Sequence, residues 1–246
     1  MPNEGRMMKK QLIGIILGIV FLNAISMSQT KNTADDLFKR ASTKYGHQDF
    51  KGAIADLTEA IKLKPDDAGA YGLRGDAKCG LKDWQGAIAD YTKVVNLKPD
   101  FAMVYNNRGN AKSELKDYRG AITDYSKAID LEQKYAVAYN NRGNAKNELK
   151  DYRGAITDYS KAIELEPEYV AAYNNRGNAK GRLYDFEGAI TDYNKAISIM
   201  PDYADAYTNR GLAYLGLDQK SEALADFMKA RELGKIVSQE LFDMCQ

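Results

Sequence analysis

The stretch YNNRGNAKSELKDYRGAITDYSKAIDLE (residues 105–132) returns almost unchanged as YNNRGNAKNELKDYRGAITDYSKAIELE at residues 139–166. These two copies differ only at Ser113/Asn147 and Asp130/Glu164, and a third copy opens with YNNRGNAK at Tyr173. The copies lie 34 residues apart, and fainter ones begin near residues 34, 68 and 204. A fixed period of this length is typical of an array of small stacked units.

Each unit is expected to form two helices. In the fourth unit the first helix runs from Ala136 to Leu149, and the second starts at Gly154 with apolar residues at helical spacing. Asp151 is placed to cap the second helix, and Pro167 to end it. We predict six units, followed by a short capping helix over residues 238–246. The units span residues 34–67, 68–101, 102–135, 136–169, 170–203 and 204–237.

Small and aromatic residues recur at fixed places in the units. Gly143 and Ala155 would let two helix backbones approach closely, and Tyr152 and Tyr159 would wedge between helices. The chain has 17 tyrosines, and we interpret this excess as mostly core. A single helical hairpin cannot bury such groups, so the units must stack.

Together, the period, the small residues, the aromatic residues and the closing proline resemble the tetratricopeptide family over residues 34–237. The resemblance implies an all-α, right-handed superhelical solenoid of antiparallel helix pairs that binds proteins and has no enzymatic activity. It also implies that the first helix of each unit lines the concave side. The chain departs from the usual pattern with arginine before the first-helix glycine, as in Arg142, and with lysine three residues after it, as in Lys146.

The arginines have a matching acidic residue in the second helix of each unit. We predict that each pair ties the two helices of its unit together, because a half-buried arginine needs a partner. The alternative is an arginine row that grips an acidic ligand. The arginines are Arg40, Arg74, Arg108, Arg142, Arg176 and Arg210, and the aspartates are Asp56, Asp90, Asp124, Asp158, Asp192 and Asp226.

Two rows of mostly asparagine side chains form the candidate binding site. The first row is Asn107, Asn141, Asn175 and Asn209, and the second row, three residues later, is Asp76, Asn110, Asn144 and Asn178. A three-residue step keeps both rows on one face of each helix. An amide side chain can pair with both N–H and C=O of a peptide bond, so the rows suit an extended polypeptide.

The first row also resembles, in position, the asparagine ladder in the superhelix of the protein O-linked N-acetylglucosamine transferases. The alternative is a harmless surface residue copied by duplication, although asparagine is a poor helix former. The neighbouring Asn106, Asn140 and Asn174 are expected to line the same groove or to face solvent. Side-chain selectivity is expected at a more variable inner row, which consists of Tyr45, Cys79, Ser113, Asn147, Gly181 and Leu215.

No motif of an enzyme, a metal site or a cofactor site is found. The one histidine, His47, lies in a turn, and Cys79 and Cys245 lack ligand spacing, so they are interpreted as unpaired thiols with a disulfide as the alternative. Lysine plus arginine number 35 against 34 acidic residues. This balance argues against nucleic acid as a partner, because phosphate binding needs a basic patch.

The first 28 residues are expected to be a cleavable export signal. Arg6, Lys9 and Lys10 precede the apolar run LIGIILGIVFL (residues 12–22), and small residues follow at Ser26 and Ser28. The run is short for a membrane span, and an uncleaved N-terminal anchor is the alternative. After cleavage no membrane association is expected, and the protein would be periplasmic or extracellular.

The resulting hypothesis is an exported scaffold that holds an extended segment of a partner protein in its concave groove. The alternative is a structural element that self-associates into an envelope or secreted assembly, since near-identical units present near-identical surfaces.

Overall fold

The computed structural model describes residues 33–246, so the predicted export signal at residues 1–28 lies outside the described part. That part is built from helices alone, arranged as six consecutive pairs and a short final helix. None of its helices is long and apolar enough to cross a membrane. The helices are α2 (Ala34–Gly46), α3 (Phe50–Leu63), α4 (Ala68–Gly80), α5 (Trp84–Leu97), α6 (Ala102–Glu114), α7 (Tyr118–Leu131), α8 (Ala136–Glu148), α9 (Tyr152–Leu165), α10 (Val170–Arg182), α11 (Phe186–Ile199), α12 (Ala204–Gly216), α13 (Lys220–Glu232) and α14 (Gln239–Asp243).

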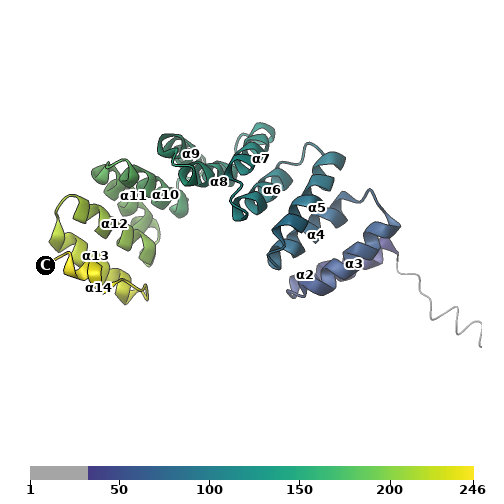
Figure 1. The fold of residues 1–246 in the computed structure, drawn as a ribbon, viewed down its shortest axis with the longest axis horizontal. Helices are drawn as coiled ribbons and strands as arrows, with labels where there is room; N and C mark the ends of the chain where they lie inside the picture. The colour runs from purple at the N-terminus through teal and green to yellow at the C-terminus, as the bar shows by residue number, and fades with distance from the viewer. Residues whose placement is uncertain (1–32) are drawn as a thin grey trace, which may run out of the picture.

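The predicted all-α tandem array is confirmed. The pairs follow one another along an arc, with the first helix of each pair on its inner side (Figure 1). We call this inner side, formed by α2, α4, α6, α8, α10 and α12, the groove. Each helix packs against its neighbours in sequence, so the hydrophobic core runs along the whole array instead of forming one compact centre.

Short turns join the two helices of each pair. In the fourth pair the Asp151 side chain accepts a hydrogen bond from the Gly154 backbone N–H at 3.0 Å, which confirms the predicted cap. The preceding residue, Lys150, has φ of +63°, a left-handed conformation that lets the chain reverse within the turn. The same cap is made by Asp49, Asp83, Asp117 and Asp185.

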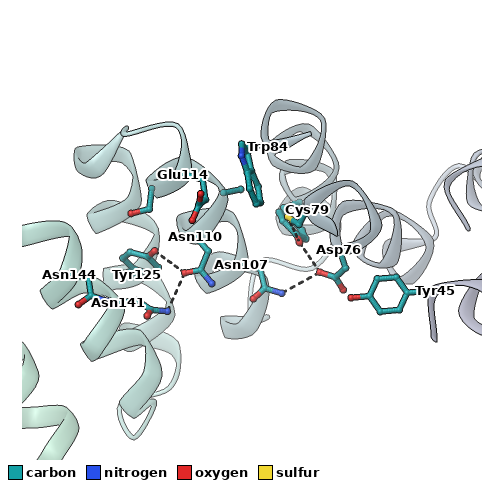
Figure 2. Close-up of a pocket in the computed structure, with 13 residues that line it drawn as sticks. Tyr45, Asp76, Cys79, Trp84, Asn107, Asn110, Glu114, Tyr125, Asn141 and Asn144 are labelled. Carbon is teal, nitrogen blue, oxygen red and sulfur yellow. Dashed lines mark hydrogen bonds between the residues drawn. The ribbon is translucent and has the colours of Figure 1, made fainter. Parts of the chain in front are cut away.

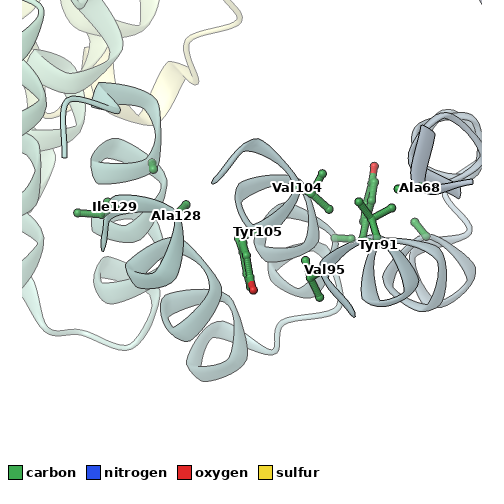
Figure 3. Packing of buried hydrophobic residues seen from close by; sticks show 11 residues of the cluster. Ala68, Tyr91, Val95, Val104, Tyr105, Ala128 and Ile129 are labelled. Atoms are coloured by element: carbon green, nitrogen blue, oxygen red, sulfur yellow. The ribbon is translucent and has the colours of Figure 1, made fainter. Parts of the chain in front are cut away.

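The small residues allow the close helix approach that the sequence predicted. A Cβ atom placed on Gly143 would lie 2.6 Å from Cε1 of Tyr159, so only glycine fits against this ring. Tyr159 itself is 1% exposed. One buried cluster runs through several successive helices, with Val95, Val104 and Ile129 among its members (Figure 3). The tyrosines at this repeated position, Tyr91, Tyr125, Tyr159 and Tyr193, are therefore core residues, as expected.

The predicted arginine–aspartate pairs are present in all six units. Arg142 donates from Nε and Nη2 to the two carboxylate oxygens of Asp158 at 2.9 and 2.7 Å, and Lys146 lies 2.7 Å from the same carboxylate. The remaining Nη1 donates to Ser126 Oγ in the preceding unit at 3.1 Å. In the second to sixth units Nε, Nη1 and Nη2 of the arginine all donate within the array, so these arginines tie helices together, whereas Arg40 in the first unit is half-exposed and uses only Nε and Nη2. The lysine that departs from the family pattern completes this ion pair in five units.

The last helix covers the apolar end of the array. Phe242 of α14 is 8% exposed and packs edge-on against Phe227 of α13, with ring centroids 6.2 Å apart. Arg231 lies over the outer face of the Phe242 ring at 4.8 Å. Leu215, which the sequence placed in the variable inner row, packs into this cluster instead of facing the groove.

Candidate binding groove

A pocket of about 570 Å³ opens on the groove between α2 and α8 (Figure 2). Members of both predicted rows line it, and these residues come from three successive first helices. The sequence period therefore brings residues far apart in the chain to one surface. The lining residues are Tyr45, Asp76, Cys79, Trp84, Tyr91, Asn107, Asn110, Ala111, Ser113, Glu114, Tyr125, Asn141 and Asn144.

The first asparagine row uses its amide hydrogens inside the protein. Asn141 Nδ2 donates to Asn106 Oδ1 and to Asn110 Oδ1, both at 3.1 Å and both in the preceding unit. Asn175 repeats this pattern with Asn140 and Asn144. Asn209 donates to Asn174 Oδ1 at 2.9 Å, and Asn107 donates to Asp76 Oδ1 at 3.5 Å. The row therefore links neighbouring units, which the sequence did not indicate.

The second row uses its carboxamide oxygens inside the protein. The Tyr125 hydroxyl donates to Asn110 Oδ1 at 2.8 Å, the same atom that accepts from Asn141. Tyr159 and Asn144 make the same bond at 2.8 Å. Tyr193 and Asn178 make it at 2.7 Å. The buried tyrosines thus fix the orientation of this row from behind.

These bonds leave the two rows with opposite polarity toward the groove. Within residues 33–246, the Nδ2 groups of Asn110, Asn144 and Asn178 have no hydrogen-bond partner, so the second row presents donors. The Oδ1 atoms of the first row are open apart from a 3.5 Å contact between Asn140 Nδ2 and Asn141 Oδ1, so this row presents acceptors. For Asn141 and Asn175, which use both amide hydrogens, and for Asn110 and Asn144, whose Oδ1 accepts twice, the expectation that one amide offers both a donor and an acceptor is corrected accordingly.

A third set of asparagines is buried rather than exposed. Asn106, Asn140 and Asn174 are 3 to 5% exposed and accept the amide hydrogens of the first row. The expectation that they line the groove or face solvent is therefore wrong. They lie between consecutive first helices, where a buried polar group needs a partner in the next unit.

The second unit departs from the asparagine pattern. Asp76 stands in the second row, and Gly72 and Leu73 stand where the next unit has Asn106 and Asn107. The Tyr91 hydroxyl donates to Asp76 Oδ1 at 2.7 Å and lies 3.4 Å from the Cys79 sulfur. Burial raises the pKa of the Asp76 carboxyl above its ordinary value, and the hydrogen bond from Tyr91 offsets part of this rise.

Two further pockets adjoin these rows. One of about 210 Å³ has a mostly apolar lining that includes Leu73, Val94 and Met103, and it shares Asp76 and Asn107 with the first pocket. It opens beside Gly72, where the missing side chain leaves space. The other, of about 400 Å³, lies near the C-terminal end of the groove and is lined by Asn147, Asn178, Gly181, Arg182, Phe186, Tyr193, Asn209, Leu212 and Ala213.

The pockets place most of the predicted selectivity row in the groove. Tyr45, Cys79 and Ser113 line the first pocket, and Asn147 and Gly181 line the one near the C-terminal end. Sequence reasoning missed Trp84, Glu114 and Phe186, because their positions match core or turn positions in the other units. The sequence signal that could have found them is that the residue type at each of these positions differs between the six units.

The cysteines and the acidic residues form no further site in the described part of the chain. Cys79 and Cys245 are both free, which agrees with the interpretation as unpaired thiols. Cys79 lies in the groove, whereas the Cys245 sulfur is 3.2 Å from the Leu241 carbonyl oxygen near the C-terminus. No group of His, Cys, Asp and Glu residues between 33 and 246 could hold a metal ion.

Comparison with known protein families identifies the repeat. The TPR repeat model matches residues 75–116, 109–149, 143–183 and 185–218. A tetratricopeptide repeat model matches residues 204–233. A search of curated proteins found no significant match.

Solved structures with the same architecture include MamA, YrrB and PilW. MamA is 32% identical, with a TM-score of 0.61 over 65% of this chain and 94% of that chain. YrrB, described as a TPR protein with an unusual peptide-binding site, is 22% identical, with a TM-score of 0.60 over 72% of this chain and 91% of that chain. PilW, a type IV pilus biogenesis factor, is 19% identical, with a TM-score of 0.74 over 87% of this chain and 98% of that chain.

At these lower identities YrrB and PilW show the shared fold alone, whereas the family models cover more than half of the sequence. The chain belongs to the tetratricopeptide repeat family of non-enzymatic scaffolds for protein–protein interaction.

Proposed function

We propose that this protein is an exported scaffold that holds an extended segment of a partner protein in its groove. The observation that carries the proposal is the opposite polarity of the two asparagine rows. Donors from Asn110, Asn144 and Asn178 run beside acceptors from the first row on the same face of successive helices.

An extended polypeptide has the complementary pattern. Each residue other than proline offers one backbone N–H and one C=O, and both need partners when water is removed. The second row would donate to carbonyl oxygens and the first row would accept from N–H groups. This pattern favours recognition of the main chain, with selectivity added by side chains that enter the adjoining pockets.

The amide rows are held in place before a ligand arrives. Tyr125 and Asn141 fix Asn110 from two sides, and the same arrangement holds Asn144. A site that is already ordered loses little conformational entropy on binding, so more of the interaction energy contributes to affinity. The asparagines therefore have a structural role and a proposed binding role that use different atoms of the same side chain.

Binding can be tested by inverting the polarity of the second row. Replacing Asn110, Asn144 and Asn178 with aspartate keeps Oδ1, which accepts from tyrosine and from the first row, and replaces the open donor with an acceptor. Peptides selected from a random display library on the unmodified protein would then be measured by fluorescence polarisation. We expect the triple variant to bind neutral selected peptides about tenfold or more weakly, because the donors to the backbone are lost.

A matched control separates polarity from added charge. Thr123→Asp, Thr157→Asp and Thr191→Asp place the same three charges on exposed positions of the second helices, away from the groove. This control should bind like the unmodified protein. Equal binding by the inverted variant would move the site to another surface and contradict the proposal. Peptides with N-methylated backbone amides should also bind more weakly, because they cannot donate to the first row.

The export part of the proposal rests on residues 1–28. The basic start, the apolar run from Leu12 to Leu22 and the small residues near Ser28 together are typical of a secretory signal. Intact-mass measurement of the protein from its native host should show loss of these residues. A full-length protein that sediments with membranes would instead support an uncleaved anchor.

A further inference from the structure

The carboxylate of Asp76 is not needed for the hydrogen bonds that hold it. Tyr91 and Asn107 both donate to its Oδ1, and in the next unit Tyr125 and Asn141 make the same two bonds to the amide oxygen of Asn110. An asparagine at position 76 would therefore serve the array equally well. What the carboxylate changes is the second atom, which becomes a charged acceptor where the other units have an amide donor.

That charged atom lies in a pocket without positive side chains. The lining contains the carboxylates of Asp76 and Glu114, and no lysine, arginine or histidine. The lysines on the same two helices are engaged elsewhere, because Lys78 lies 2.7 Å from Asp90 and Lys112 lies 2.7 Å from Asp124. The pocket therefore has a negative potential that the protein does not neutralise.

The thiol of Cys79 lies in the same pocket. Burial raises its pKa above the ordinary value, the hydrogen bond with Tyr91 lowers it, and the nearby charges of Asp76, Asp83 and Glu114 raise it. Four aromatic rings also line the pocket, from Tyr45, Trp84, Tyr91 and Tyr125. Figure 2 shows Tyr45, Trp84 and Tyr125 among them. Aromatic faces attract cations and cover the aliphatic stem of a long basic side chain.

We propose that this pocket binds one lysine or arginine side chain of the segment held in the groove. The inference rests on the proposed function, and it adds a requirement for a basic residue that main-chain recognition alone does not impose. The volume of about 570 Å³ accommodates a side chain of that size, and Asp76 and Glu114 supply the counter-charges. The site lies in the N-terminal half of the groove, so it also sets where along the array the basic residue is placed.

The test uses the only tryptophan in the chain, Trp84, which lines the pocket and reports its occupancy by fluorescence. The probes are short acetylated and amidated Gly/Ser/Ala peptides with a single central Lys, Arg, Gln or Glu. We expect the Lys and Arg peptides to bind about tenfold or more tightly than the Gln peptide, and the Glu peptide to bind most weakly.

Variants then assign this preference to the pocket. Asp76→Asn should remove most of the preference for Lys over Gln. Because the substitution adds an amide donor to the second row, it should not weaken binding of the Gln peptide. Glu114→Gln should reduce the preference in part. The control is Asp130→Asn, which removes the same charge from an exposed position on α7 and should have no effect. Circular dichroism would confirm that each variant remains folded.

Three results would overturn the inference. The first is equal binding of the Lys and Gln peptides, or binding of neither. The second is a Lys preference that survives both Asp76→Asn and Glu114→Gln. The third is a Gln peptide with a free N-terminus that binds as tightly as the acetylated Lys peptide, which would assign the pocket to a terminal amine. If the unmodified protein shows no Lys preference but its binding of the Gln peptide still depends on the second row, the pocket alone is refuted and the proposed function stands.

Discussion

Replacing Asn141 with alanine should destabilise the array, and the size of the loss depends on whether the hydrogen-bond partners of Asn141 keep another partner. The substitution removes the two hydrogen bonds that Asn141 donates, to Asn106 and to Asn110, and the 3.5 Å bond that it accepts from Asn140. Asn110 Oδ1 keeps the bond from Tyr125, but Asn106 is 3% exposed and loses its partner. An unsatisfied buried acceptor costs about 1–3 kcal/mol. Alanine regains about 0.5 kcal/mol of helix propensity, so the expected net loss is about 1–2 kcal/mol.

The same substitution at Asn107 is the matched control. Its partner is Asp76 at 3.5 Å, and the preceding unit has Gly72 where Asn106 would be, so no buried asparagine is left without a partner. The lost bond and the gain in propensity are both a few tenths of a kcal/mol and should nearly cancel. Asn107→Ala should therefore change stability little, although the two asparagines occupy equivalent positions.

Urea unfolding followed by circular dichroism would measure both variants. Repeat arrays can depart from two-state unfolding, so the urea midpoints of the variants are compared directly. Hydrogen exchange of the backbone amides in α6 and α8 gives a second, local measure of stability. Equal destabilisation by Asn107→Ala and Asn141→Ala would refute the reasoning, because it would show that the loss does not arise from the buried partner. A double-mutant cycle of Asn106→Ala and Asn141→Ala should give a coupling energy of about 1 kcal/mol, because the double variant leaves no buried acceptor without a partner.

This result also bears on how binding is tested. Alanine at all four first-row positions would leave three buried acceptors unpaired and remove about 3–6 kcal/mol, a large part of the stability of an ordinary domain. Weak binding by such a variant would not distinguish a lost site from a loosened array. The second-row aspartate substitutions avoid this problem because they keep every internal acceptor.

Three other predictions concern the helix packing, the Asp76 carboxyl and the oligomeric state. Gly143→Ala should destabilise by about 1–2 kcal/mol in urea unfolding, because overpacking against Tyr159 exceeds the gain in helix propensity, whereas Gly181→Ala, with nothing within 4 Å of the new Cβ, should be neutral or stabilising. Burial raises the pKa of Asp76 above its ordinary value, so ionisation of this carboxyl at neutral pH costs the folded state part of its stability. Asp76→Asn should therefore raise the melting temperature at pH 7, and this advantage should vanish below about pH 4, where the unfolded carboxyl is protonated too; an equal gain at both pH values would contradict this account. Sedimentation equilibrium should give the mass of one chain at all concentrations, whereas a mass that rises with concentration would favour the self-association alternative.

Much of the fold could be predicted because its signals are local and repeat. The cap at Asp151, the turn before it and the apolar spacing of α9 depend on neighbours within a few residues in the sequence. The pairing of Arg142 with Asp158 could also be predicted, because an unpaired arginine inside a helix pair is costly and one aspartate recurs at a fixed distance.

The candidate site could be predicted only in part. Both asparagine rows were found, because a three-residue step on a helix fixes which side chains share a face. Their hydrogen-bond directions were not, since an amide can point either atom toward the groove until its partners are known. Those partners lie in other helices, as Tyr125 does for Asn110 and as Asn106 does for Asn141.

The sequence by itself determined the helix pairs, their stacking order and the residue types that recur on each face, because a repeat in sequence forces a repeat in structure. Only the tertiary structure decided which atoms face the groove and which residues close the seams between units. It also decided that the second unit, with Gly72 and Asp76, opens an apolar pocket beside an acidic one. These features depend on contacts between residues 15 to 35 positions apart, and a single side chain that differs from the repeat changes them without altering the helices around it.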